Sequence, residues 1–217
     1  MKDNLAIILT VLSIIIPVFA TLYTAQVRVR NVEKESHKPY LGLGDVEKIY
    51  NINRFGYFLA IIGSKFKTKE EDLGILTRKE GNINVELAIR NIGYGVASNI
   101  KFYNLETSKL VVGLQETAQN INQKKYTTFD IPKDMAKKVQ ACLVTEKEDG
   151  VLVAERHNIL CIYQDLNENV YDFIICIEIK ESGTYDFYAY QRSSHSYKRL
   201  INEMKSEYKK ILSDYKK

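Results

Sequence analysis

The three histidines are the side chains best suited to acid–base catalysis or zinc binding, but they are scattered along the chain as His37, His157 and His195. A zinc site or a histidine-activated nucleophile needs partner residues at defined spacings. None of the three has a cysteine, histidine or carboxylate at such a spacing. His157 follows Arg156 at the expected start of a strand, and we expect it at the surface. The histidines therefore predict no metal site and no bound cofactor.

The cysteines and the acidic residues give no stronger sign of catalysis. The cysteines are three in number and have no tight pair spacing: Cys142, Cys161 and Cys176. An odd, widely spaced set is typical of reduced, buried thiols rather than of a disulfide framework. Asp165, Asp172 and Asp186 are expected in turns and on strand faces, without the spacing of an acid–base pair. We therefore expect that the protein is not an enzyme.

The glycines at 93 and 95 are better explained by a turn than by a phosphate-binding loop. No third glycine follows at the dinucleotide-binding spacing, no Lys-Ser/Thr pair ends the loop, and a strand rather than a helix is expected next. The chain here passes from one strand through Asn-x-Gly-x-Gly and a small residue into a second strand. The turn residues that this pattern predicts are Asn91, Gly93, Gly95 and Ala97.

This turn resembles the Asn-x-Gly turn, followed by an alanine, of bacterial immunoglobulin-like and adhesion-related β-sandwich modules. The later run Tyr163-Gln164-Asp165, followed by Tyr171, resembles the hairpin near the end of such modules, although the usual glycine of that hairpin is absent here. The resemblance implies a fold only, because function resides in sites rather than in folds.

Short runs rich in Ile, Val, Tyr and Phe between residues 40 and 192 predict β-strands. The ten predicted strands are 40–50, 55–62, 83–91, 99–103, 109–113, 125–131, 139–145, 158–164, 169–179 and 184–190. Polar residues at 165–169 and 181–183 favour hairpins. Many short strands joined by turns predict a mainly β protein, an antiparallel immunoglobulin-like sandwich, rather than an α/β enzyme fold.

An uncharged N-terminal segment, residues 5–25, would reach about 30 Å as a helix, which is the thickness of the hydrocarbon core of a bilayer. We therefore predict a transmembrane helix within residues 1–25. A cleaved signal peptide is the alternative, but the apolar run passes the small residues at 18–20 and Asp3 interrupts the basic start. More basic residues follow the span than precede it, which predicts a single-pass inner-membrane protein with a cytoplasmic C-terminal domain.

Small residues recur at steps of three and four along one side of this span. They are Ala6, Thr10, Ser13, Pro17, Ala20 and Thr24. Helices in lipid associate through close approach past small side chains and through hydroxyl hydrogen bonds. The stripe predicts self-association or contact with a partner membrane protein, and its alternative is chance, since such residues are common in membrane spans.

Residues 193–217 predict a basic amphipathic helix, because they contain no Gly or Pro and repeat apolar residues at steps of four and three. The apolar seam is Tyr197, Ile201, Met204, Tyr208, Ile211 and Tyr215. Three alternatives are open: the seam packs onto the sandwich, forms a coiled coil between protomers, or lies on an anionic membrane surface. We expect no nucleic-acid partner, since a phosphate-binding protein spreads basic residues over a surface.

These patterns divide the chain into a transmembrane anchor (1–25), a juxtamembrane stalk (26–39), a β-sandwich (40–192) and a basic helix (193–217). They predict a membrane-anchored protein-binding or scaffolding module that contacts lipid and self-associates or binds a partner membrane protein. We expect recognition at loops of one sandwich end, namely 65–81 and 91–99. Two other functions stay open: an oligomeric membrane-perturbing effector, for example of a prokaryotic defence system, with a ligand-sensing β domain, and a secreted or surface adhesion module. The sequence indicates no particular small-molecule ligand.

Overall fold

The computed structural model describes residues 16–29, 32, 37–49, 57–62, 83–111, 128–144, 147–148, 151–152, 154–180, 182 and 184–216. The chain forms two compact units, residues 1–38 and residues 39–217.

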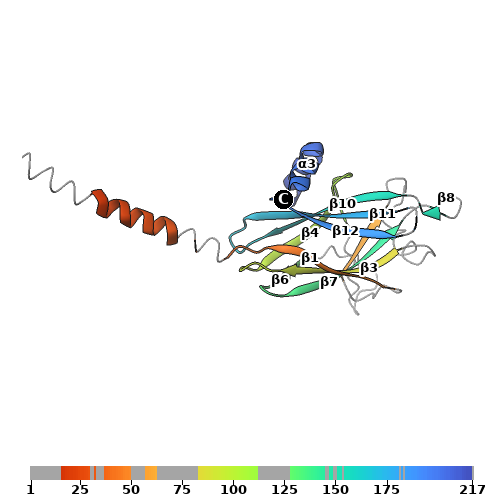
Figure 1. Ribbon diagram of the computed structural model, residues 1–217, viewed down its shortest axis with the longest axis horizontal. Helices are drawn as coiled ribbons and strands as arrows, with labels where there is room; N and C mark the ends of the chain where they lie inside the picture. Colours follow the sequence, from red (N-terminus) through yellow and green to blue (C-terminus); the bar gives the residue numbers. More distant parts are fainter. Residues whose placement is uncertain are drawn as a thin grey trace, which may run out of the picture. The chain divides into compact units, whose positions relative to one another are not determined.

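In the first unit, residues 16–29 form a helix, coloured red-orange in Figure 1. The Thr21 and Thr24 hydroxyls donate to carbonyls of their own helix, at 2.8 Å to Pro17 O and 2.7 Å to Ala20 O. The helices in the part of the chain that the structure describes all fall short of the length and hydropathy that a bilayer crossing requires. Residues 5–15 of the predicted span lie outside the described residues, so the transmembrane helix stays a prediction.

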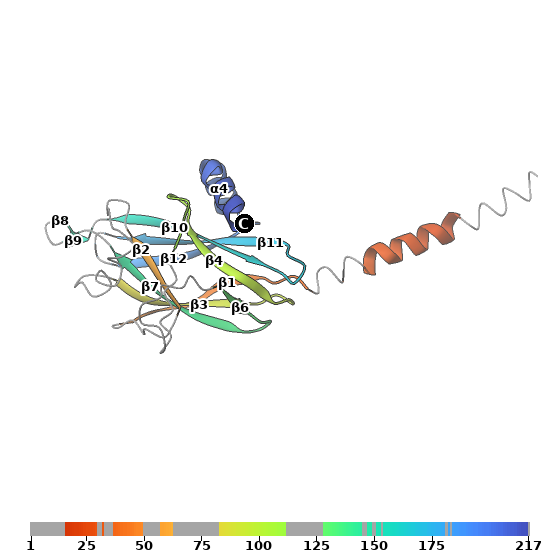
Figure 2. The same cartoon turned by 180° about the vertical axis from the view of Figure 1, so that it is seen from behind.

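The second unit is built from two sheets that enclose one apolar core (Figures 1 and 2). The first sheet has the order β1 (Leu41–Lys48), β3 (Ile83–Asn91), β7 (Ala136–Val144), β2 (Tyr57–Ile62). The second has the order β12 (Tyr185–Gln191), β11 (Val170–Ile179), β10 (Glu155–Gln164), β4 (Ala97–Asn104), β5 (Lys109–Leu110), with β6 (Phe129–Ile131) also paired to β4. A short hairpin joins β8 (Lys147–Glu148) to β9 (Val151–Leu152). Among these strands the pairs are antiparallel, apart from the parallel pair β2 and β7.

The burial of each strand follows its residue pattern. Alternate side chains of β3 are buried and their neighbours are partly exposed, which is typical of a sheet with one face against the core. β10 and β11 are buried on both faces, because one face lies on the core and the other lies under the C-terminal helices. This two-sided burial explains why these two strands are almost continuously apolar.

The C-terminal segment forms two helices, α3 (His195–Glu203) and α4 (Lys205–Tyr215), on the outer face of the second sheet (Figures 1 and 2). We predicted one continuous helix, and this is wrong. Met204 departs from helical geometry, with φ −112° and ψ 39°, so the helix is interrupted there. The break lets both halves place apolar side chains on the sheet, and of the three alternatives the structure shows the seam packed onto the sandwich.

The prediction of a mainly antiparallel β fold is confirmed. All ten predicted strands occur, and the hairpin of β8 and β9 was not predicted. His157 corrects one expectation, because it is buried, with 5% of its surface exposed. β10 begins at Glu155 rather than at 158, so His157 lies within the strand on the same face as Ile159 and Cys161.

Of the two expected recognition loops, only 91–99 lies within the described residues, so recognition by the pair stays a prediction. The segment 65–81 lies outside the described residues, but it precedes Ile83, the first residue of β3. The 91–99 turn follows Asn91, the last residue of the same nine-residue strand.

Candidate functional site

Strand β12 has a free edge. It pairs with β11 in seven consecutive residue pairs without a bulge. Among the strands that the structure describes, none pairs with its other side. Edge strands are usually protected by lysine, proline, a bulge or shortness, and the sequence Tyr-Asp-Phe-Tyr-Ala-Tyr-Gln of β12 uses none of these. Its one charged residue, Asp186, is paired with Lys180 of the preceding turn at 2.5 Å.

The register shows which backbone groups face the free edge. Lys180 N donates to Thr184 O at 2.9 Å, and this pair continues the register of β11 with β12. Hydrogen-bonded pairs alternate along an antiparallel ladder, so the even-numbered residues of β12 bond to β11. The odd-numbered residues direct their N–H and C=O groups outward: Tyr185, Phe187 and Ala189. Gln191 O, the next outward carbonyl, accepts from Ser194 N at 2.8 Å, which closes this end of the edge.

Aromatic side chains flank the edge on both faces of the sheet. Tyr185 and Phe187 pack against the inner core and meet edge to face, with ring centroids 5.6 Å apart. Tyr188 and Tyr190 stack on the outer face at 6.5 Å, and Tyr188 is 41% exposed. The charge of Asp186 raises the pKa of the Tyr188 hydroxyl. As far as the described strands show, an extended segment laid along this edge would meet unpaired backbone groups between two aromatic surfaces.

A buried carboxylate, Asp172, fixes the far end of β12. Arg192, the first residue after β12, donates to both its oxygens, with Nε 2.9 Å from Oδ1 and Nη2 2.6 Å from Oδ2. The Tyr197 hydroxyl of α3 donates to Oδ1, and the Tyr208 hydroxyl of α4 donates to Oδ2 at 2.8 Å. One side chain of β11 thus joins the end of β12 to both C-terminal helices.

The electrostatics of this cluster suit a structural role. The hydrogen bonds to Asp172 raise the pKa of the Arg192 guanidinium. Burial, and then the charge of Asp172, raise the pKa values of the Tyr197 and Tyr208 hydroxyls. At neutral pH the guanidinium is therefore charged and both phenols are protonated. With four donors on one carboxyl group, the arrangement holds four elements in place and offers no free lone pair toward a substrate.

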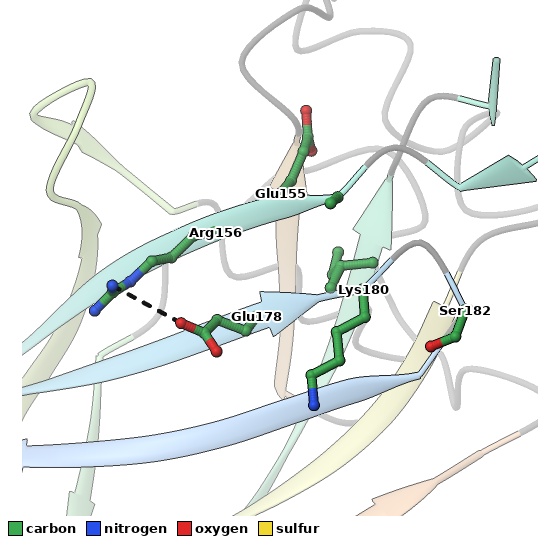
Figure 3. Close-up of a pocket in the computed structure, with 7 residues that line it drawn as sticks. Glu155, Arg156, Glu178, Lys180 and Ser182 are labelled. Carbon is green, nitrogen blue, oxygen red and sulfur yellow. Dashed lines mark ion pairs between the residues drawn. The ribbon is translucent and has the colours of Figure 1, made fainter.

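A shallow depression of about 580 Å³ lies beside the start of β12. Charged residues of both signs line it, and Arg156 and Glu178 form an ion pair of 3.8 Å across neighbouring strands (Figure 3). The Arg156 Nε also donates to Cys176 Sγ at 3.1 Å, while burial raises the pKa of that thiol. Lys180 and Ser182 line the side nearest the β11–β12 turn (Figure 3). The depression therefore lies over β10, β11 and the turn that leads into β12, and no residue of β12 lines it.

The predicted turn is organised by the buried side chain of Asn91. Its Oδ1 accepts from Tyr40 N at 3.2 Å and from Gly93 N at 3.0 Å. Its Nδ2 donates to Gly95 O at 2.7 Å and to Ile131 O at 2.9 Å. Ala97, the fourth predicted turn residue, is fully buried as the first residue of β4. The motif thus joins three segments of the chain and is structural.

The other predicted site residues divide between the two units. Pro17, Ala20 and Thr24 lie in the helix of residues 16–29, whereas the rest of the small-residue stripe lies outside the described residues: Ala6, Thr10 and Ser13. In the C-terminal seam, Tyr197, Ile211 and Tyr215 are buried against the sheet, and the seam residues partly buried beside them are Ile201, Met204 and Tyr208. The three cysteines are free and buried.

Sequence reasoning missed both the free edge and the Asp172 cluster. Asp172 was considered only as a catalytic acid and dismissed for want of a spaced partner. The signal that could have found it is its position: it is the one charged residue in the run 170–177, which is otherwise apolar and aromatic. Such a residue needs a buried partner. Arg192 lies in the following turn, at the end of the adjacent strand.

Comparison with known protein families, with curated proteins and with solved structures found no match for this chain.

Proposed function

We propose that this chain is a single-pass inner-membrane protein whose cytoplasmic β-sandwich, of immunoglobulin-like type, binds another protein along the free edge of β12. It acts as a binding or scaffolding module, and not as an enzyme. The observation that carries the proposal is the unprotected edge of β12, with outward backbone groups at Tyr185, Phe187 and Ala189. In strand addition of this kind, main-chain hydrogen bonds supply affinity and alternate side chains supply specificity.

The surroundings of the edge support an extended peptide as ligand. The even-numbered side chains of β12 offer the exposed ring of Tyr188 on the outer face. The side chains of Tyr185 and Phe187 pack against the core, which holds the backbone of this part of the edge in place. The partner segment that fits has apolar or aromatic residues at alternate positions. Rigid presentation lowers the entropy lost on binding.

The composition of the helix 16–29 supports the membrane anchor. Its large apolar side chains are exposed: Ile16, Val18, Phe19, Leu22, Tyr23, Val27 and Val29. An apolar surface of this extent is unfavourable in water, and burial in lipid would remove it from water. The Thr24 hydroxyl bonds to its own helix, as a hydroxyl in lipid must if no partner is present. The excess of basic residues after the span favours the cytoplasmic side for the β domain.

Replacing Ala189 by proline tests the binding edge. The N–H of Ala189 points outward, so proline removes one edge donor and leaves the bonds to β11 intact. We expect Ala189→Pro to lose a partner that crosslinks to the original protein in native membranes, with an unchanged circular dichroism spectrum. Ala189→Thr is the matched control, because it adds a side chain of similar size but keeps the N–H, and it should retain the partner. Recovery of the same crosslinked partner by both variants would exclude the edge as the binding site.

The anchor has its own test. Carbonate washing of membranes should leave the protein in the pellet, and protease added outside intact cells should leave the β domain undigested. Release by carbonate would refute the anchor, and digestion would refute the cytoplasmic orientation.

A further inference from the structure

Exposed apolar side chains gather at one end of the β domain. The structure describes six exposed large apolar side chains in the second unit, and five of them share this end: Tyr40, Ile92, Tyr94, Met135 and Leu166. Their exposed fractions run from 39% to 68%. We refer to these five residues as the apolar tip. Loop ends of soluble domains are normally polar, so this concentration needs an explanation.

Backbone hydrogen bonds show that the residues of the apolar tip are neighbours. Ile92 N donates to Tyr40 O, and Asn91 N donates to Met135 O, both at 2.9 Å. Tyr94 lies in the same turn, and the Lys133 ammonium is 5.0 Å from the centre of its ring. The loops before β1, after β3 and before β7 therefore form one surface.

The hairpin that carries Leu166 belongs to the same end. Gln164, two residues before it, is paired with Ser98 at the start of β4, and Ser98 Oγ donates to Gln164 O at 3.2 Å. Asp165 holds the hairpin rigid, because its carboxylate accepts from the backbone N–H of Asn167 and Asn169 at 2.8 and 2.9 Å. Leu166 projects from this fixed turn.

The point where the chain enters the β domain suggests that a bilayer covers the apolar tip. The second unit begins at Pro39, directly before Tyr40, so the chain enters the β domain at this end. The predicted span ends at residue 25, and the tether 26–39 reaches roughly 20 Å as a helix or 50 Å if fully extended. The apolar tip is therefore the end of the β domain to which the tether is attached.

The chemistry of the apolar tip also matches a bilayer interface. Tyrosine and lysine together are typical of the headgroup region, where the ring is half immersed and the ammonium extends toward water. Charges of both signs surround the tip, including Lys133, Asp130 and Asp134. Contact with lipid would therefore depend on apolar insertion rather than on attraction to anionic headgroups.

We propose that the apolar tip inserts into the interface of the same bilayer that holds the N-terminal anchor. This inference rests on the membrane anchor of the proposed function and is independent of binding at β12. The strands extend away from the apolar tip, so insertion of the tip would direct the long axes of the strands away from the membrane surface. The free edge of β12 then runs away from the bilayer and stays open to a partner in the cytoplasm.

Lipid quenching of a site-specific fluorophore tests the inference on the full chain in liposomes. The native cysteines are buried, so one added surface cysteine is the reactive thiol. An environment-sensitive dye is attached to Leu166→Cys or Tyr94→Cys, and in the control to Tyr188→Cys, which is exposed on β12. We expect both tip labels to emit at shorter wavelength than the control label, because lipid surrounds them. Nitroxide-labelled lipids should quench both tip labels and leave the control label unchanged. Adding Ile92→Ser and Met135→Ser to the Leu166→Cys protein should weaken the quenching.

The outcomes separate this inference from the anchor. Carbonate-resistant protein with unquenched tip labels would overturn the inference and leave the anchor standing. A second outcome is that the tip labels are shielded from aqueous iodide but are not quenched by the lipids. This would mean that a protein surface, such as a second copy of the chain, covers the apolar tip, and it would also overturn the inference. Release of the chain by carbonate would overturn the anchor, and the inference with it.

Discussion

Arg192 and Asp172 form a two-point ion pair with very different exposure at its two ends. The Arg192 side chain is 47% exposed, whereas the Asp172 side chain is completely buried. The Arg192 side chain is thus in partial contact with solvent, whereas the carboxylate that it binds is shielded from water. The two partners should respond differently to substitution, because only one of them would be left charged in an apolar site.

Arg192→Met should lower the free energy of unfolding by about 3 kcal/mol, because it leaves the buried carboxylate with only the two phenols as donors. Urea unfolding followed by circular dichroism measures this. In the double variant with Asp172→Asn no charge remains, and the loss should be smaller than in Arg192→Met alone. A double variant that is less stable than the single one would show that the pair does not act through the buried charge.

High pH should unfold the domain through its buried tyrosines. Because the folded state raises the pKa of Tyr197, its contribution is complete below about pH 10, where the phenol is protonated in both states. Above that pH the unfolded chain ionises first, so stability falls as pH rises. Tyr197→Phe should be less stable at neutral pH by about 1 kcal/mol, yet show a shallower loss above pH 10. Tyr94→Phe, at an exposed position, is the control for the loss of one tyrosine hydroxyl.

Asn91→Ala should be among the most damaging single substitutions in the turn regions. It removes the four side-chain bonds to Tyr40, Gly93, Gly95 and Ile131 and leaves buried backbone groups unpaired. We expect a loss of about 3 kcal/mol in urea unfolding. Asn91→Asp keeps the acceptor but not the donor, so it should be nearly as harmful. Ile92→Ala, at the exposed neighbour, should change stability by less than about 0.5 kcal/mol.

The parts of the fold that sequence could predict are those set by local pattern. β3 and the Asn91 turn follow from residue alternation and from a short motif, and both lie where the pattern placed them. The interruption of the helix at Met204 could not be predicted from the sequence, because the apolar repeat continues across it without a glycine or proline. Its cause is tertiary: both helix halves must fit the sheet, and the Tyr197 and Tyr208 hydroxyls must reach Asp172.

The candidate site could not be predicted from the sequence, because it too depends on tertiary structure. The aromatic alternation of β12 predicts a strand, but whether that strand is central or at an edge depends on the order of strands in the sheet. The direction of each backbone group at Phe187 or Ala189 follows from the register with β11, which one chain segment does not encode by itself. Likewise, Arg192 and Asp172 are 20 residues apart and meet only because β11 and β12 form a hairpin.

Glu168→Gly should stabilise the β10–β11 hairpin. Glu168 adopts φ 62°, in the left-handed region, where a side chain is strained and glycine is not. The register of this turn is kept by the backbone N–H groups of Asn167 and Asn169, which donate to the Asp165 carboxylate. Relief of backbone strain stabilises the folded state, whereas glycine also raises the entropy of the unfolded chain. The net effect should be a gain of about 0.5–1 kcal/mol in the free energy of unfolding, measured with urea. Glu168→Ala is the matched control, since it removes the carboxylate but keeps the strained backbone, and it should show no gain. An equal gain in both variants would mean that the charge of Glu168, and not its backbone conformation, destabilises the turn.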